Sequence, residues 1–207
     1  YRDRKAYDML IQAETGLISV TGTPDAAAKT GIPAADIGAG MYVLTAVLAA
    51  LVRRGVTGEG ATVSVSMFDA IAEWMTHPLY IRLYGGRQVE RAGVGHAAIV
   101  PYDRYPTADG EILIGVQNER GWELLMTEVL GRPELVDDPR YATNIARVRR
   151  RAEVDALIAA ETATFTTGEL DERLAAAGVP AAEIRELDGL ADHPQLRMRE
   201  RWRTVGT

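Results

Sequence analysis

One apolar segment, from Gly38 to Arg54, constrains the fold of this chain more than any other part of it. Its hydrophobic side chains recur at the three- and four-residue spacing of one helix face. They are Val43, Leu44, Val47, Leu48, Leu51 and Val52. Gly38 and Gly40 lie at the start, and Gly55 follows the end, where a glycine often takes the left-handed conformation that ends a helix. We therefore expect a long apolar core helix that ends at Gly55.

A strand and a second helix are expected to follow. Residues 61–66 alternate small or apolar side chains with polar ones, which is typical of a strand with one buried face. Phe68 to Leu83 has helical character, and we expect a break near Pro78 because proline lacks a backbone N–H. Strands and helices in alternation favour an α/β domain.

A second region follows a glycine-rich segment without periodicity, residues 87–98, which we interpret as a linker or a mobile loop. A hairpin is expected around the Asp109-Gly110 turn, with strands at 102–107 and 112–116. Further elements are expected along the rest of the chain. They are helices at 121–130, 147–164 and 167–177, a short strand at 182–187, a short helix at 194–201 and the start of a strand after it.

These elements predict four parts. Residues 1–86 belong to a large domain, 87–98 form the linker, 99–187 form a small α+β domain, and 188–207 return towards the large domain.

Composition excludes several classes of protein. The 207 residues include 23 Lys+Arg and 29 Asp+Glu, so the net charge of −6 disfavours binding to nucleic acid or to an anionic membrane. We expect no apolar run of the roughly 18 residues that cross a bilayer. The absence of cysteine excludes disulfides, thiol nucleophiles and Cys-ligated metals, and it fits a cytoplasmic protein. His77, His96 and His193 are too widely spaced to suggest a metal site.

Asp36 has two open interpretations. It comes just before the apolar helix, where an Asp commonly caps the first turn. The same position suits a nucleophilic carboxylate, because Gly38 and Gly40 leave room for a substrate and the helix N-terminus offers N–H groups to developing negative charge. The spacing alone leaves both interpretations open.

Several short motifs occur in a specific order. They are Tyr7-Asp8 with Gln12-Ala13-Glu14-Thr15-Gly16, then Gly31–Gly40, Ala49–Gly60, Val63–Ala70, Gly95-His96 with Pro101–Gly110, Gly178-Val179-Pro180 and Asp192–Gln195. Together they resemble the class III CoA-transferases of the CaiB/BaiF type. This family also includes formyl-CoA transferases and α-methylacyl-CoA racemases.

The resemblance implies a large Rossmann-like domain, a smaller α+β domain and a homodimer of interlocked subunits with active sites between domains. Family chains are much longer, and this one begins without Met, so we expect an interior piece of the enzyme. Such a piece would expose sheet edges and apolar surface by itself.

The resemblance also implies site residues. Asp36 would attack an acyl-CoA thioester to form a mixed anhydride and then an aspartyl-CoA thioester, so that one exchange is split into easier steps. Gly38 would let the substrate approach, and Gly93 and Gly95 would belong to a loop that closes over the intermediate, or to an ordinary linker. His96 would line the acyl pocket or be a satisfied loop histidine. Coenzyme A would be a substrate, with no bound prosthetic group.

Tyr7 separates the two branches of the family. In the racemases, the position that matches Tyr7 looks like a His paired with the Asp, because moving an α-proton needs a base on each face. A tyrosine side chain has an ordinary pKa near 10, so it binds an acyl oxygen better than it shuttles protons. We expect a CoA-transferase; an α-methylacyl-CoA racemase and a catalytically silent structural fragment are the alternatives.

The expected substrates are an acyl-CoA and a carboxylic acid, with dicarboxylates such as succinate or a C5 acid as the suggested class. Three arginines could bind a second carboxylate or simply be exposed. They are Arg82, Arg91 and Arg104.

Overall fold

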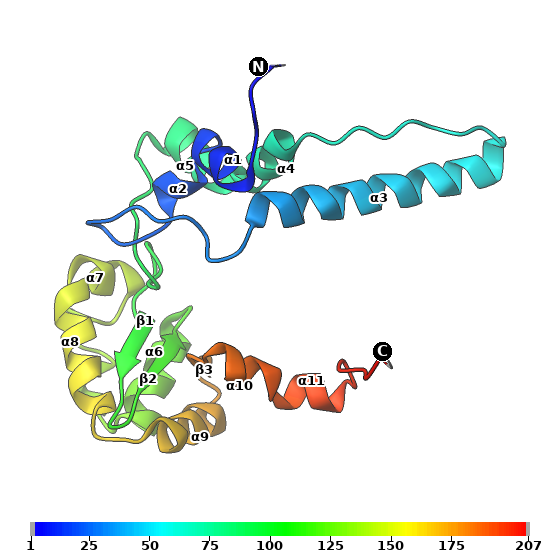
Figure 1. Ribbon diagram of the computed structural model, residues 1–207. Helices are drawn as coiled ribbons and strands as arrows, with labels where there is room; N and C mark the ends of the chain where they lie inside the picture. The colour runs from blue at the N-terminus through cyan, green and yellow to red at the C-terminus, as the bar shows by residue number, and fades with distance from the viewer. Residues whose placement is uncertain (1–2, 206–207) are drawn as a thin grey trace. The chain divides into compact units, whose positions relative to one another are not determined.

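The computed structural model describes residues 3–205, which form two compact units. The N-terminal unit ends at Gly93 and the C-terminal unit begins at Val94 (Figure 1). The chain mixes helices with a small antiparallel sheet, as expected for the coarse fold class. The finer division into four parts stays a prediction.

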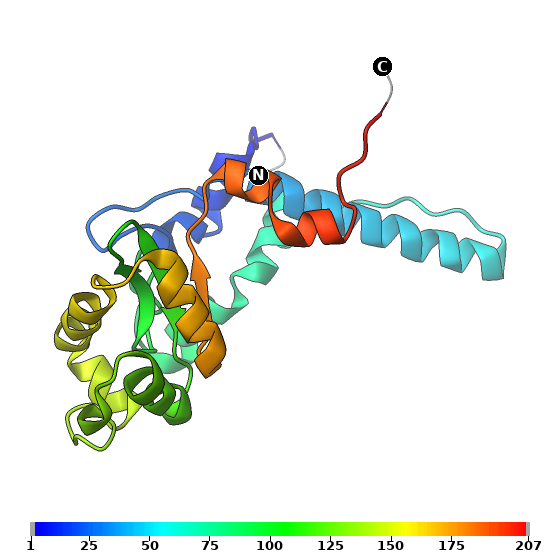
Figure 2. The same cartoon turned by 90° about the horizontal axis from the view of Figure 1, so that it is seen from below.

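Helices make up the N-terminal unit. They are α1 (Asp8–Glu14), α2 (Leu17–Val20), α3 (Ala34–Thr57), α4 (Met67–Trp74) and α5 (Thr76–Gly85) (Figures 1 and 2). Three buried side chains, Ile11, Ala35 and Ile71, join α1, α3 and α4. Leu17, Met67 and Met75 pack around them. This core is small, so polar contacts between α1 and α3 carry more weight in the unit.

The long helix α3 differs from the prediction at both ends. It begins at Ala34, so Asp36 is the third residue of its first turn and does not precede the helix. It continues through Gly55 to Thr57 and ends at Gly58, whose φ of 75° is left-handed and whose N–H donates to the carbonyl of Arg54 at 2.8 Å. The predicted end at Gly55 is wrong because a glycine ends a helix only where it adopts the left-handed conformation.

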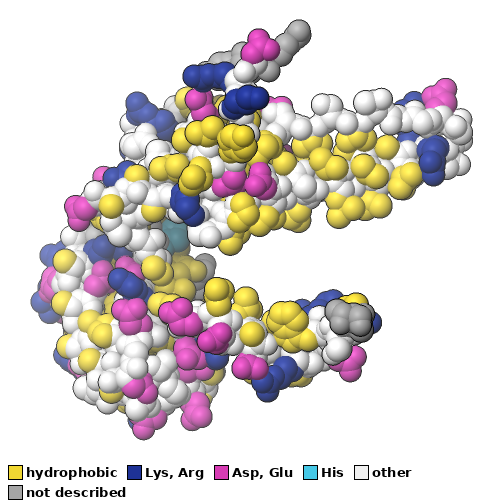
Figure 3. Space-filling model, viewed as in Figure 1, with side chains coloured by type: hydrophobic (Ala, Val, Ile, Leu, Met, Phe, Trp, Pro, Cys, Tyr) yellow, Lys and Arg dark blue, Asp and Glu magenta, His cyan; other side chains and the backbone are white. Residues whose placement is uncertain are grey.

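Most of α3 is exposed. Apolar side chains line it along its length in Figure 3. They include Met41, Leu44, Leu48, Leu51, Val52 and Val56. The expectation that no segment is long enough to cross a bilayer is wrong: within residues 3–205, α3 alone has the length and the apolar composition for it. Core helices of soluble proteins meet the same criterion, so length and composition alone assign α3 no role in a membrane.

The strand predicted at 61–66 does not form. The segment runs back beside α3 in both ribbon views without a strand arrow, although Val63 and Val65 are half-buried between exposed neighbours as the alternation predicted (Figures 1 and 2). An extended segment becomes a strand only when another backbone pairs with it. Within residues 3–93 the structure has one isolated bridge, between Gly22 and Ala27, and no sheet.

The break between α4 and α5 falls at Met75, three residues before the predicted position at Pro78. Pro78 lies in the first turn of α5, where its missing N–H removes no intrahelical hydrogen bond. Ser66 caps α4, accepting the N–H of Asp69 at 3.2 Å.

A three-stranded antiparallel sheet organises the C-terminal unit. Its strands are β1 (Tyr102–Pro106), β2 (Glu111–Gly115) and β3 (Ala181–Glu183), in the order β1-β2-β3. The register pairs Tyr102 with Gly115 and Ile114 with Ala181. The hairpin prediction is confirmed, and the strand predicted at 182–187 is shorter, ending at Glu183.

Helices pack on this sheet. They are α6 (Glu119–Leu124), a π-helical turn η1 (Leu125–Val129), a 3₁₀ turn η2 (Pro133–Leu135), α7 (Asn144–Arg149), α8 (Arg151–Thr162) and α9 (Thr167–Ala177). The helix predicted at 147–164 is therefore two helices, and α9 starts from a capping box of Thr166 and Glu169. The core is larger than that of the N-terminal unit and centres on Trp122, with Ile112 and Ile114 from β2 and Leu170 and Leu174 from α9.

Two short helices, α10 (Leu187–Ala191) and α11 (Pro194–Met198), end the described chain. The strand predicted to begin after them is absent through Val205, the last described residue.

Asp109 ties the hairpin turn to the start of α9. Its Oδ1 accepts the Thr167 N–H at 2.8 Å and the Thr167 hydroxyl at 2.9 Å, and these bonds hold the pKa of the carboxyl below its ordinary value of 3.8. A lowered folded pKa means that the stabilisation is present above the unfolded pKa and is lost as the pH falls through the folded one.

We expect Asp109→Asn to lower stability at pH 7 and to flatten its decline in acid. Urea midpoints measured from pH 7 down to pH 3 test this. Asp171→Asn, which removes an exposed carboxylate from α9, is the matched control. If the stability of Asp109→Asn fell with decreasing pH as steeply as that of the parent chain, the assignment would be contradicted.

Candidate functional site

The first turns of α1 and α3 meet, and the candidate nucleophile lies at this junction. Asp36 is exposed, and within residues 3–205 its carboxylate has no hydrogen-bond or ion-pair partner. Its backbone N–H is 3.4 Å from Oδ1 of Asp8, the residue after Tyr7. Tyr7 is the N-cap residue of α1 and is 69% exposed. Tyr7 and Asp36 are thus carried by two adjoining helix starts.

Asp36 does not cap α3. Pro33 occupies the N-cap position and provides no side-chain acceptor. Instead, Asp8 of α1 accepts the Ala35 N–H at 2.7 Å. A carboxylate at a helix N-terminus is favourable because the exposed N–H groups there carry partial positive charge. With Asp8 in this role, the Asp36 carboxylate points to no partner in the described chain and is accessible to a substrate.

Gly38 lies one half-turn further along α3 and is buried. A Cβ atom there would be 3.1 Å from ring atoms of Trp74, so the glycine allows the indole of α4 to lie against α3. Trp74 remains 48% exposed, and its Nε1 donates to the Tyr42 hydroxyl at 3.3 Å. A hydrogen bond with Glu73 raises the pKa of the Tyr42 phenol. Substrate contact by Gly38 stays a prediction.

Sequence patterns did not identify Trp74 and Tyr42 as neighbours of this site. The available signal was the four-residue spacing of Gly38 and Tyr42, which puts both on one face of α3. It does not say which residue of another helix meets that face.

The glycine loop spans the boundary between the two units. Gly93 has a left-handed φ of 64°, and its N–H donates to the carbonyl of Gly22 at 2.9 Å. Gly95 and His96 belong to the C-terminal unit. Loop closure over an intermediate stays a prediction. The left-handed conformation of Gly93 would strain a residue with a side chain, which explains the glycine at this position.

His96 is held within its own loop. Its ring stacks on Tyr102 with centroids 5.4 Å apart, and its Nδ1 accepts the Ala98 N–H at 3.1 Å. Its carbonyl accepts from Arg151 at 2.7 Å. Acceptance at Nδ1 leaves Nε2 as the protonated nitrogen of a neutral ring. The contribution of His96 to an acyl pocket stays a prediction.

The three candidate arginines have partners within the protein. Arg91 donates to the carbonyls of Thr23 at 2.8 Å and Pro24 at 3.0 Å, so it fastens the loop before α3. Arg82 donates to the carbonyl of Gly86, and Arg104 pairs with Glu111 at 3.4 Å. These contacts favour structural roles over recognition of a second substrate carboxylate.

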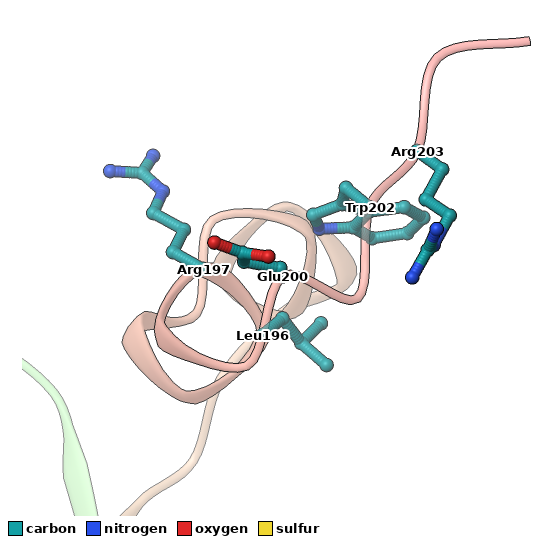
Figure 4. Close-up of a pocket in the computed structure, with 5 residues that line it drawn as sticks. All are labelled: Leu196, Arg197, Glu200, Trp202 and Arg203. Atoms are coloured by element: carbon teal, nitrogen blue, oxygen red, sulfur yellow. The ribbon is translucent and has the colours of Figure 1, made fainter.

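The described chain has a groove beside α1 and a hollow near its end. A groove of about 1050 Å³ lies beside α1. It is lined by Arg4, Lys5, Ala6, Leu10, Ile11, Ala13, Glu14, Ser66, Met67 and Phe68. A hollow of about 490 Å³ at the end of the chain is framed by Leu196, Trp202 and charged side chains (Figure 4). None of the candidate site residues lines either hollow. Among the described residues, no cluster of His, Asp or Glu is arranged to hold a metal ion.

A family model matches the sequence along its whole length. Residues 1–207 match the family model described as CoA-transferase family III, and the chain belongs to this family. The resemblance drawn from the motifs is therefore confirmed.

Individual relatives are more specific. The chain is 34% identical over 200 residues to succinate–glutarate CoA-transferase of Agrobacterium fabrum, covering 96% of this chain and 50% of the relative. It is 29% identical to succinyl-CoA:glutarate CoA-transferase of Mus musculus, covering 93% and 44%. The chain spans about half the length of the curated relatives it matches.

Solved structures match in the same way. A CAIB/BAIF family protein from Brucella suis has a TM-score of 0.83 and 34% identity, covering 96% of this chain and 53% of that one. Rv3272 from Mycobacterium tuberculosis has a TM-score of 0.80 and 27% identity, covering 95% and 51%.

Proposed function

We propose that this chain carries the nucleophile of an acyl-CoA:carboxylate CoA-transferase, and that Asp36 is this nucleophile. The observation that carries the proposal is the exposed carboxylate in the first turn of α3, without a partner in residues 3–205, while Asp8 caps the helix in its place. Membership of CoA-transferase family III supplies the reaction class.

The reaction proceeds through covalent intermediates on Asp36. A carboxylate oxygen of Asp36 attacks the thioester carbonyl of the donor, the C–S bond breaks, and CoA leaves as a thiolate. The thiolate then attacks the aspartyl carbonyl of the mixed anhydride, which releases the donor acid and leaves an aspartyl-CoA thioester. The acceptor carboxylate attacks this thioester and forms a second anhydride with release of thiolate. Attack of the thiolate on the acceptor acyl carbon gives the new acyl-CoA and restores Asp36.

Tyr7 supports the transferase over the racemase. Its exposed phenol at the start of α1 is suited to donate a hydrogen bond to an acyl oxygen during attack. Racemisation requires a base on each face of the α-carbon, and tyrosine is a weak base at neutral pH. The Gly93 to Gly95 loop would close over the intermediate and exclude water.

Short dicarboxylic acids are the proposed substrates. Relatives named as acting on succinate and glutarate, D-citramalate and mesaconate point to this class. The further features of the proposal are a Rossmann-like sheet completed outside this chain, an interlocked homodimer and a cytoplasmic location. The exposed apolar face of α3 is consistent with packing against such a sheet.

Trapping the covalent intermediate tests the proposal. The complete protein is incubated with succinyl-CoA and quenched with hydroxylamine, which attacks the activated Asp36 carbonyl and leaves a hydroxamate. Peptide mass spectrometry is expected to find the hydroxamate at Asp36 only when acyl-CoA is present. An unmodified Asp36 across a panel of acyl-CoA thioesters would refute the assignment. Deuterium exchange at the α-carbon of a 2-methylacyl-CoA would then indicate a racemase, and no reaction would indicate a silent structural piece.

A further inference from the structure

Helix α3 begins without a cap from its own segment. The first N–H groups of any helix lack intrahelical acceptors, and a neighbouring side chain usually satisfies one of them. Pro33 cannot do so, because its side chain has no acceptor. The acceptor comes from α1, where Oδ1 of Asp8 lies 2.7 Å from the Ala35 nitrogen and 3.4 Å from the Asp36 nitrogen. The first turn of α3 is therefore tied to a residue 27 positions earlier in the chain.

Asp8 is itself held in place by Gln12. The second carboxylate oxygen, Oδ2 of Asp8, accepts from Nε2 of Gln12 at 2.6 Å. Gln12 is fully buried, and its Oε1 accepts the Thr30 N–H at 3.0 Å. One continuous set of hydrogen bonds thus joins the loop that enters α3, the buried amide on α1 and the turn that carries Asp36.

The donors and acceptors in this set have only one consistent arrangement. An ionised carboxylate only accepts, so Gln12 must turn its NH₂ towards Asp8 and its oxygen towards the Thr30 N–H. Because Gln12 is buried, a mismatch at either end leaves a polar group without a partner. The apolar core at this junction has three buried residues with three partly buried ones packed around them, so these polar contacts add to a small apolar core.

We propose that Asp8 and Gln12 are positioning residues that fix the Asp36 backbone, and so its carboxylate, for attack on the acyl-CoA thioester. This rests on the proposed function of Asp36. Neither residue reacts. They act through the α3 turn, and a displacement of an attacking group by about 1 Å costs about 100-fold in rate.

Exchanging the polarity of the pair gives a sharp test. Asp8→Asn keeps an acceptor for Ala35 but turns an NH₂ towards the NH₂ of Gln12. Gln12→Glu instead turns a second carboxylate towards Asp8. Each single variant is expected to lower kcat about 10- to 100-fold with KM little changed. The double variant Asp8→Asn with Gln12→Glu matches donors to acceptors again, because the new amide donates to the new carboxylate, which accepts from Thr30.

We expect the double variant to recover at least about tenfold in kcat over either single variant, the non-additivity typical of residues in one network. Amide hydrogen exchange at Ala35 and Asp36 should rise in both single variants and fall again in the double variant. Glu14→Gln is the matched control, since it removes a carboxylate from α1 that forms an exposed pair with Arg4. Its kinetics and exchange are expected to match those of the parent.

The outcomes separate this proposal from the function it rests on. If the parent protein forms no hydroxamate at Asp36, the proposed function fails, while amide exchange still decides whether the pair holds the turn. If the parent is acylated and both single variants are acylated at the same rate, the positioning role is overturned. A double variant as impaired as the single variants, or single variants that differ from the parent only in KM, would also overturn it. Should the single variants fail to fold, recovery of fold and turnover in the double variant alone supports it.

Discussion

Asp36→Asn is expected to reduce CoA transfer by about 10³- to 10⁶-fold, the range found when a covalent nucleophile is removed. Asparagine keeps the size and one oxygen of the side chain but cannot form the anhydride. The variant should fold normally, because the parent carboxylate makes no hydrogen bond or ion pair within residues 3–205 that the substitution would break. The measurement is the rate of succinyl-CoA exchange with a second dicarboxylate, together with hydroxamate trapping.

Asp69→Asn is the matched control. Asp69 is also exposed and also the third residue of its helix, α4, so the substitution repeats the chemical change at an equivalent helical position. It is expected to keep nearly full transfer. Asp36→Asn with transfer close to that of the parent would show that the nucleophile lies elsewhere.

Arg147→Met is expected to destabilise the C-terminal unit by about 2–6 kcal/mol, since two carbonyls each lose a charged donor at about 1–3 kcal/mol apiece. Arg147 is fully buried, with Nε donating to the carbonyl of Val100 and Nη1 to that of Tyr141, both at 2.7 Å. Its guanidinium carbon is 4.8 Å from the centre of the Trp122 ring. Burial lowers the pKa of the guanidinium, yet arginine stays charged at any working pH.

The substitution keeps the apolar volume of the stem and removes only the donors. Urea unfolding of the complete protein, with hydrogen exchange of residues in β1 and α7, measures the loss. Arg149→Met, at an exposed position of the same helix, should change stability by less than about 0.5 kcal/mol. A loss in Arg147→Met no larger than in this control would mean that the two carbonyls find other donors.

Local patterns predicted the C-terminal unit well. The Asp109-Gly110 turn between the two expected strands predicted the hairpin, and its register is observed as Tyr102 opposite Gly115. The helix predicted at 167–177 is observed with those bounds, and Thr166 precedes it as the cap, with Glu169 completing the capping box. Turns and caps involve residues two to four apart, so the sequence contains the whole interaction.

Patterns failed where an element depends on a distant partner. Residues 61–66 have the alternation of a strand, but no described backbone pairs with them. Gly55 was the expected end of the long helix because glycine is common there. The helix continues to Thr57, because Gly58 is the glycine that adopts the left-handed conformation. The spacing predicted the apolar face of α3, whereas its exposure was expected only from the resemblance to longer chains, since burial depends on what packs against the helix.

The sequence by itself determined the family, the approximate position of the long helix and the choice of Asp36 as the candidate nucleophile. Motif order and hydrophobic spacing are properties of the chain alone. Only the tertiary structure decided how Asp36 is held. Its freedom from capping depends on Asp8, which lies 28 residues earlier and is oriented by a buried Gln12. No local spacing encodes such a contact, because it exists only after α1 and α3 have packed together.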